Sequence, residues 1–333
     1  FALIFAPVAG FLINEQYAFL LILPQRIFSG INQFPILAVP LFMLAGQIMT
    51  VGEITNSLVR FANSLLGHIR GGLAHVNILS SILFAGLSGS AVADTSALGS
   101  IFFPAMKQDG YTLRFAAAVT AASSVIGPII PPSLIMILYS FVMETSVAAM
   151  FAGGFIPGFI MGGSLMVTSS ILAKKNNFPK REHRAPVSEV VTAARGAVLP
   201  LLTPVIIIGG ILLGIFTPTE AAGVAVFYSL FVGLFIYREL TLKKVIEALR
   251  FTALLTGILI LLTPTLAFGQ LTAFYDVPTA VQDGITSLTE NKYLVLLLIG
   301  VFYIFIGTFM ESLAQIVLFT AVFLPLVVSL GVD

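Results

Sequence analysis

Three acidic residues stand inside apolar stretches of a chain that otherwise keeps its charges in short polar segments. They are Asp94, Glu220 and Glu311. An ionised carboxylate at the centre of a membrane costs about 2.5–3.5 kcal/mol, and no Lys or Arg falls in the same stretches to offset that cost. Each carboxyl group must therefore be protonated, hydrogen-bonded at a helix N-terminus, or close to a bound cation. The first chemistry that these residues indicate is the binding of a cation.

Small polar residues and prolines supply the other ligands that such a cation would need. Ser88, Gly89 and Ser90 precede Asp94 and Thr95 in a segment that is weak in helix formers. Further on, three prolines fall within five positions of the run Gly127-Pro128-Ile129-Ile130-Pro131-Pro132-Ser133. Proline removes a backbone donor, so a helix through 114–142 must break there and leave free carbonyl groups. The hydroxyls of Ser88 and Ser90 and the carbonyls near Gly127 and Pro131 form a set suited to a hard monovalent cation.

Simpler explanations remain open for each of these features. Asp94 is equally suited to cap the free N–H groups of a helix that starts beside it. Thr217-Pro218-Thr219 before Glu220 is typical of a helix start, which favours capping for that carboxylate. The prolines are also compatible with a simple kink or an interfacial helix end. Glycines spaced by four residues favour close helix packing, as in Gly154-x3-Gly158-x3-Gly162 and Gly210-x3-Gly214.

Composition decides the class of protein in which these residues act. The 333 residues include 16 basic and 15 acidic side chains, 9% of the chain, where a soluble domain carries about 25%. The hydrophobic fraction is 58% and the mean hydropathy is +1.06. A soluble enzyme, a disulfide scaffold and a disordered linker are excluded, and the net charge of +1 gives no footprint for nucleic acid. Long, non-alternating apolar runs predict an all-α polytopic membrane protein.

The distribution of basic residues predicts how the chain crosses the membrane. The segments 173–195 and 238–250 are rich in Lys and Arg, and the positive-inside rule places both in the cytoplasm. Charges at both ends of 71–106 place that stretch between two cytoplasmic ends. Its small polar centre predicts a re-entrant helical hairpin with the tip at a site. Continuous spans are expected at about 1–13, 36–51, 150–172, 197–215, 217–237 and 251–273.

A second stretch, 292–330, repeats the pattern of the first hairpin. Gly86, Pro104 and Gly110 have counterparts 221 positions later, which are Gly307, Pro325 and Gly331. The second stretch starts on the outside by loop charge, so the two would form an inverted-topology repeat, a mark of secondary transporters. Gly307, Thr308 and Glu311 then occupy the second tip.

Several other functions are alternatives to a cation-coupled carrier of organic anions. Gly86-Leu87-Ser88-Gly89 fits the pattern of an intramembrane serine protease, but none of His68, His75 and His183 is well placed as its base. A channel, or a carrier that works without a binding protein, is an alternative that composition leaves open. The chain has no G-x4-G-K-[ST] loop for nucleotide hydrolysis.

Three long motifs carry a resemblance to a known family. They are Gly86-Leu87-Ser88-Gly89-Ser90-Ala91-Val92-Ala93-Asp94-Thr95-Ser96-Ala97-Leu98-Gly99-Ser100, the run from Phe115-Ala116-Ala117-Ala118 through Ile126-Gly127-Pro128-Ile129-Ile130-Pro131-Pro132-Ser133, and Gly214-Ile215-Phe216-Thr217-Pro218-Thr219-Glu220-Ala221-Ala222. From about residue 24 onward the chain resembles the large membrane subunit of TRAP (tripartite ATP-independent periplasmic) transporters, the DctM-like family.

The resemblance implies a sodium-driven carrier of the bacterial inner membrane for organic acids such as dicarboxylates, keto acids or sialic acids. It implies a periplasmic substrate-binding protein and a small four-helix membrane subunit, separate or fused, as partners, and no cofactor besides Na⁺ as the coupling ion. The family fold has two inverted repeats, each with a hairpin and a broken helix, in a transport domain that moves as an elevator past a scaffold. The matching residues are the first tip (Ser88, Gly89, Ser90, Asp94) and the break from Gly127 to Ser133.

The same resemblance divides the chain into four parts. Residues 1–70 would form scaffold helices and an amphipathic arm, 71–149 the first hairpin and broken helix, 150–291 scaffold and connecting helices with cytoplasmic basic loops, and 292–333 the second hairpin. We expect both ends of the chain to be truncated, with a second broken helix beyond residue 333. The second hairpin departs from the family pattern at Ser312 and at Thr320-Ala321, where the family usually has proline.

Overall fold

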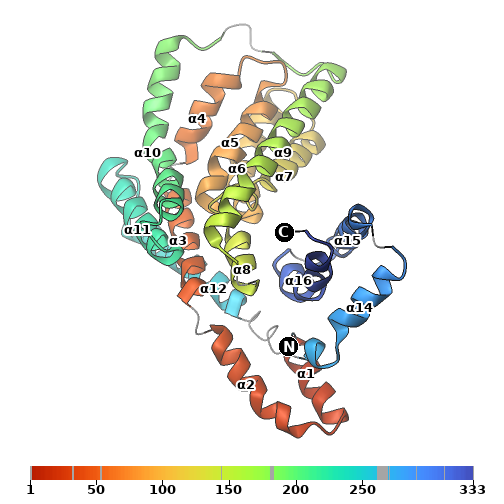
Figure 1. Cartoon of the computed structure of the whole chain (residues 1–333). Coiled ribbons are helices and arrows are strands. Elements are labelled where there is room, and N and C mark those ends of the chain that lie inside the picture. Colours follow the sequence, from red (N-terminus) through yellow and green to blue (C-terminus); the bar gives the residue numbers. More distant parts are fainter. Residues whose placement is uncertain are drawn as a thin grey trace. The chain divides into compact units, whose positions relative to one another are not determined.

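The computed structural model describes residues 2–31, 34–52, 55–143, 145–180, 184–260, 269, 271–289, 291–310 and 312–332. Helices joined by turns account for the regular structure of these residues (Figure 1). The chain divides into two compact units, one made of Phe1–Ile36, Phe141–Glu144 and Leu255–Asp333 and the other of Leu37–Ser140 and Thr145–Leu254. The prediction of an all-helical membrane protein is confirmed at this level.

The larger unit contains the first hairpin and the broken helix. The hairpin packs beside α7 and α9, and α10 and α11 pack on α3 and α4 (Figure 1). The helices that lie wholly or mostly in this unit are α3 (Ala38–Val51), α4 (Thr55–Leu66), α5 (Gly72–Ser88), α6 (Ala91–Gln108), α7 (Leu113–Ser124), α8 (Leu134–Val142), α9 (Val147–Lys175), α10 (Val187–Leu212), α11 (Pro218–Phe231) and α12 (Leu242–Ile260).

Three helices of this unit are long and apolar enough to cross a membrane. They are α9, α10 and α11 with the π-helical turn Val232–Ile236 that continues it. The pair α3 and α4, bent by 70°, adds a fourth if it counts as one broken span. Large apolar side chains such as Ile156, Phe159 and Ile160 of α9 are exposed, as a surface that faces lipid requires.

A two-residue turn separates α5 from α6. Gly89 ends α5 in the left-handed region, with φ of 58°, a conformation that glycine adopts without a steric cost. Ser90 is extended and begins α6, where its Oγ accepts a hydrogen bond from the backbone N–H of Ala93 at 3.4 Å. The glycine and the serine of the predicted tip thus end one helix and begin the next, with caps on both sides of the turn.

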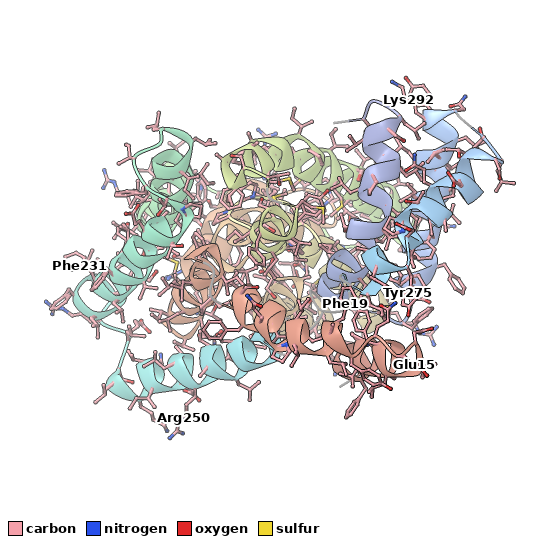
Figure 2. All side chains as sticks on the ribbon, turned by 60° about the horizontal axis from the view of Figure 1, so that its bottom comes forward. Glu15, Phe19, Phe231, Arg250, Tyr275 and Lys292 are labelled. Carbon is pink, nitrogen blue, oxygen red and sulfur yellow. The ribbon has the colours of Figure 1, made fainter. Side chains whose placement is uncertain are left out.

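The smaller unit contains the second helix–turn–helix. Its helices are α1 (Ala2–Ile13), α2 (Tyr17–Ile31), α14 (Val277–Thr286), α15 (Lys292–Ile306) and α16 (Ser312–Ser329). Phe19 of α2 forms an aromatic cluster with Phe11 and Phe274, whose ring centroids lie 5.1 and 4.7 Å from that of Phe19. Figure 2 labels Phe19 and also Tyr275, which follows Phe274 in the chain. Part of the predicted span 251–273, residues 261–268 and 270, lies outside the described residues.

The second helix of each hairpin follows the offset of 221 found in the sequence. Moving the bounds of α6, Ala91–Gln108, by that offset gives those of α16, Ser312–Ser329. The glycines after them, Gly110 and Gly331, both have positive φ, 83° and 67°. The bounds of α5 moved by the same offset do not give those of α15, so the repeat and its inverted orientation in the membrane both stay predictions.

A column of glycines on α9 holds the broken helix against that long span. A Cβ atom at Gly158 would lie 2.3 Å from Ile130 Cγ1, and one at Gly162 would lie 2.7 Å from Ile82 Cδ1. At Gly154 the same atom would lie 2.5 Å from the carbonyl oxygen of Ile129. The predicted packing role of this column is confirmed.

The second predicted glycine pair has two different roles. A Cβ at Gly210 would lie 2.4 Å from Phe216 Cδ2, so this glycine serves packing. Gly214 has no neighbour within 4 Å of such an atom and adopts a φ of +69° just after α10. Its part of the packing prediction is therefore wrong, because Gly214 allows the turn that follows the helix.

Gly158→Ala should destabilise the protein because the new methyl group displaces Ile130, at a cost of about 1–3 kcal/mol. Gly163→Ala on the same helix is the matched control, since a Cβ there meets nothing within 4 Å. The control should be neutral or up to about 1 kcal/mol more stable through helix propensity. Thermal unfolding of both variants in detergent measures the difference. Equal melting temperatures would show that the column does not determine the packing.

Candidate ion and substrate site

The break predicted from the prolines lies between α7 and α8. Helix α7 ends at Ser124, and α8 begins after Ser133, with turns between them and a cis peptide bond at Pro131-Pro132. The hydroxyl of Ser133 donates to the carbonyl oxygen of Pro128 and accepts from the backbone N–H of Met136 at 3.2 Å. Ser133 therefore caps α8 and ties it to the turn that replaces the helix.

The structure brings the hairpin tip and this break together. A Cβ at Gly89 would lie 2.8 Å from the carbonyl oxygen of Pro132 and 3.1 Å from the backbone nitrogen of Leu134. A Cβ at Gly86 would lie 3.7 Å from the carbonyl oxygen of Pro131. At Gly89 only glycine allows so close a contact, so the backbone of the tip lies directly on the backbone of the break.

Asp94 is fully buried at this junction. A Cβ at Gly127 would lie 2.6 Å from Asp94 Oδ2, so the carboxylate lies against the glycine that begins the proline-rich turn. The capping position of α6 is taken by Ser90, whose carbonyl oxygen also accepts from the Asp94 N–H at 3.0 Å. The carboxylate of Asp94 therefore contacts the break, whereas the alternative considered above had placed it as the helix cap.

Four helix ends converge on this junction. Helices α5 and α7 end there, and helices α6 and α8 begin there. C-termini carry partial negative charge and N-termini partial positive charge. A junction of this kind can therefore hold a cation and an anion side by side.

The ligand set at the junction suits a monovalent cation. It consists of one carboxylate, the hydroxyl of Ser90, which is only partly buried, and backbone carbonyls such as that of Pro132. Among the described residues no three His, Cys, Asp or Glu side chains lie close enough to hold a metal together. The side chain of Ser88 lies outside what the structure describes, and Thr95 donates within its own helix to the carbonyl oxygen of Ala91 at 2.8 Å.

Glu220 lies away from this junction, at the start of α11. Its Oε2 accepts from the backbone N–H and the hydroxyl of Thr217, both at 2.8 Å, and its own N–H donates to Thr217 Oγ1 at 3.3 Å. This reciprocal pair is a capping box. The capping predicted for Glu220 is confirmed, Thr219 beside it is buried, and the carboxylate is exposed.

The second tip is closed by a residue that the sequence analysis did not single out. Gly307 follows α15 in a right-handed conformation, and the hydroxyl of Thr308 donates to the carbonyl oxygen of Phe305 at 2.8 Å. The buried side-chain amide of Gln315 donates to the carbonyl oxygen of Met310 at 2.8 Å across the tip. Glu311 lies outside the described residues.

A buried polar seam between α5 and α7 also escaped the sequence analysis. We define the α5–α7 seam as the six residues Asn77, Ser80, Ser81, Thr120, Ser123 and Ser124, all with 0% exposure. Asn77 Nδ2 donates to Thr120 Oγ1 at 2.7 Å, and Ser81 Oγ donates to Ser123 Oγ at 2.8 Å. The signal was present as Ser-Ser pairs inside apolar helices, a pattern that close packing explains equally well.

These features define a class, a helical membrane protein in which a hairpin tip and a buried carboxylate lie on a broken helix. The chain belongs to the family described as tripartite ATP-independent periplasmic transporter, DctM component, whose profile matches residues 1–333. A sialic acid TRAP transporter large permease protein of Vibrio cholerae is 41% identical, over 100% of this chain and 78% of the relative. A C4-dicarboxylate TRAP transporter large permease protein of Pseudomonas aeruginosa is 37% identical, over 92% and 72%.

A third relative broadens the range of substrates named in the family. It is a 2,3-diketo-L-gulonate TRAP transporter large permease protein of Escherichia coli, 36% identical over 94% of this chain and 73% of its own length. The relatives are permease subunits of transporters, and the chain is accordingly not an enzyme. The protease alternative is therefore wrong, and His75 instead bonds to Ser170 of α9 at 2.8 Å.

Gly127→Ala should destabilise the protein by about 1–3 kcal/mol because its methyl group displaces the Asp94 carboxylate. In a double-mutant cycle with Asp94→Ala, the double variant should be less destabilised than the sum of the single variants, by about 0.5–3 kcal/mol. Part of the cost should persist, since the Ser124 carbonyl oxygen also lies 3.1 Å from the new methyl. Chemical unfolding in detergent measures all four proteins.

Gly99→Ala provides the control for that cycle. Gly99 is buried on α6, but a Cβ there meets its neighbours at ordinary distances of 3.5 Å or more. Its cost should add to that of Asp94→Ala to within about 0.5 kcal/mol. If the Gly127 pair is equally additive, the carboxylate does not depend on that contact.

Proposed function

We propose that the chain is the large membrane subunit of a sodium-coupled carrier that takes up a small organic anion. The observation that carries this proposal is the position of the buried Asp94 carboxylate against Gly127, where the hairpin tip meets the broken helix. Burial disfavours the ionised form of a carboxylate, and a cation bound at this junction would stabilise that form.

In this mechanism the cation organises the junction for the anion. Sodium would be held by Asp94, the Ser90 hydroxyl and carbonyls at the C-terminal ends of α5 and α7, and it would supply a fixed positive charge there. The N-termini of α6 and α8 then present N–H groups and partial positive charge to the substrate. Occupation by the cation thus precedes tight binding of the anion, which couples the two fluxes.

The substrate class follows from what is common to the relatives' names. Sialic acid, C4-dicarboxylate and 2,3-diketo-L-gulonate are all small organic acids that are ionised at neutral pH. A junction of two helix N-termini suits a carboxylate without selecting among these molecules. We therefore propose an organic acid of this kind, with a periplasmic binding protein making the choice.

The chain would work in the bacterial inner membrane with two partners. One is the periplasmic substrate-binding protein, and the other is a small four-helix membrane subunit, separate or fused. A Haemophilus influenzae sialic acid TRAP transporter permease protein, 38% identical, is covered by this chain over only 50% of its length, which leaves room for a fused partner. The mechanism would be an elevator movement of the hairpins and broken helices past the other helices.

A carrier and a channel are expected to differ in transport rate and in sodium dependence. Uptake that saturates and needs a sodium gradient, measured in proteoliposomes with the complete complex, supports the carrier. Ion currents at channel rates would contradict it. Uptake that is independent of the binding protein would instead support a carrier that acts alone.

Ser90→Ala should raise the sodium concentration for half-maximal uptake by about five- to tenfold, the loss of about 1–1.4 kcal/mol expected for one ligand. Sodium-dependent uptake by the full complex in proteoliposomes is the measurement. Unchanged sodium dependence would exclude the Ser90 hydroxyl as a ligand.

Thr112→Ala is the matched control for the loss of a helix cap. Thr112 Oγ1 accepts from the Phe115 N–H at 3.3 Å at the start of α7, as Ser90 Oγ does at the start of α6. Both variants lose a cap worth about 1 kcal/mol, but only Ser90→Ala should change the sodium dependence. An equal change in both would mean that Ser90 acts only through the stability of its helix.

Asp94→Asn should abolish sodium-coupled uptake, by more than about tenfold, because the isosteric amide removes the negative charge that faces the cation. The fold should persist, since a neutral amide is easier to bury than a carboxylate. Uptake assays paired with thermal unfolding separate the two effects. A variant that transports with normal sodium dependence would remove Asp94 from the mechanism.

A further inference from the structure

The α5–α7 seam is a polar interior that the junction at the hairpin tip does not use. Asn77, Ser80 and Ser81 are spaced by three and four residues, so they share one face of α5. Thr120, Ser123 and Ser124 share one face of α7 in the same way. The hydrogen bonds from Asn77 to Thr120 and from Ser81 to Ser123 show that the two faces meet.

The donors of the seam are mostly used within it. The hydroxyls of Ser123 and Ser124 both donate to the carbonyl oxygen of Thr120, at 3.2 and 2.7 Å. The amide nitrogen of Asn77 and the hydroxyl of Ser81 donate across the seam. Of the side-chain oxygens that are left over, Asn77 Oδ1 can only accept, while Ser80 Oγ can accept or donate.

Two side-chain atoms of the seam have no hydrogen-bond partner among the described residues. They are Asn77 Oδ1 and Ser80 Oγ, on residues that are 0% exposed and three positions apart on one helical face. A buried polar atom of this kind nearly always has a partner in a folded protein. These two oxygens are therefore candidates to bind a water molecule or a small ligand.

The charge around the seam selects a cation. No Lys or Arg belongs to it, and its α7 side ends against the acidic junction. The carbonyl oxygen of Ser124 and the Asp94 carboxylate both lie within 3.1 Å of one point, the Cβ position of Gly127. When the Asp94 carboxylate is ionised, these oxygens favour a cation over an anion at this end of the seam.

We propose that the α5–α7 seam is a hydrated binding site for a monovalent cation. It is separate from the hairpin tip and reaches the junction at Ser124. Asn77 Oδ1 and Ser80 Oγ are its protein ligands, and water completes the coordination. The site would give a cation that leaves Asp94 a second position between α5 and α7, nearer to the N-terminal end of α5. It adds a step to the proposed function, but its occupancy can be measured without transport.

The absence of cysteine from the chain allows a direct test with Ag⁺, a monovalent cation similar in size to Na⁺. Ser80→Cys places a thiol in the seam at a residue whose side-chain oxygen has no hydrogen-bond partner among the described residues. Ag⁺ that reaches it forms an S–Ag bond and releases the thiol proton. Unbound Ag⁺ is then removed, the protein is unfolded, and the remaining thiols are counted with a maleimide.

Ile78→Cys is the matched control. Ile78 lies two positions away on α5, is also 0% exposed, and belongs to the apolar core. Ser80→Cys should react with Ag⁺ at least about tenfold faster than Ile78→Cys, because a buried thiol reacts only where the reagent has access. Excess sodium nitrate should slow the reaction at Ser80→Cys severalfold relative to choline nitrate.

Two results would overturn the proposal. Equal rates at the two positions would show that the seam is closed to ions, and equal rates in sodium and choline would show that it holds water only. Ser123→Cys repeats the test from α7 if Ser80→Cys does not fold, as judged by gel filtration. Ser90→Cys at the tip separates the hypotheses, since a reactive tip with an unreactive seam refutes the seam site and leaves the proposed function intact.

Discussion

The burial of one carboxylate governs the architecture around it. Asp94 lies at 0% exposure against Gly127, and the surrounding backbone is arranged so that this position is tolerable. Two helices end and two begin there, which places peptide groups where side-chain charges are lacking. Gly127 leaves room for the carboxylate itself, whereas Gly89 leaves room for the backbone of Pro132 and Leu134. The buried carboxylate and the ends of the interrupted helices therefore occupy the same place in the fold.

Serine hydroxyls make interrupted helices compatible with an apolar surrounding. Each half-helix that begins at the junction has its first turn capped by a serine, Ser90 for α6 and Ser133 for α8. Unsatisfied N–H groups at membrane depth would otherwise cost several kcal/mol each. The packing of α9 through its glycine column adds a rigid wall behind the break. Local capping and long-range packing thus stabilise the same few turns.

Sequence alone predicted the features that arise from backbone chemistry. Prolines 128, 131 and 132 fixed the break, and Gly89 with Ser90 fixed the tip, because these residues restrict the backbone whatever surrounds them. The direction of the Asp94 side chain was not predictable, since the sequence allows the helix to start at Ser90 or at Asp94, four positions later. Ser90 took the capping position and left the carboxylate to face Gly127.

The seam illustrates a second limit. Serines and an asparagine within apolar helices are compatible with packing, with hydrogen bonding across helices or with a ligand, and only tertiary contacts distinguish these. At the second hairpin Gly307 and Thr308 were the predicted tip residues, whereas the bond that closes the described part of the tip comes from Gln315. A long side chain that reaches back over a turn leaves no local signature in the sequence.

The contact between Asp94 and Gly127 also constrains how the protein can evolve. A methyl group at 127 and a carboxylate at 94 compete for the same space, so a residue larger than glycine at 127 is not compatible with the observed position of Asp94. Chains of this family that have lost the acid should be released from the glycine, and those that keep the acid should keep both. Two positions far apart in the sequence should in this way vary together, because the space for one Cβ atom depends on the side chain at the other position.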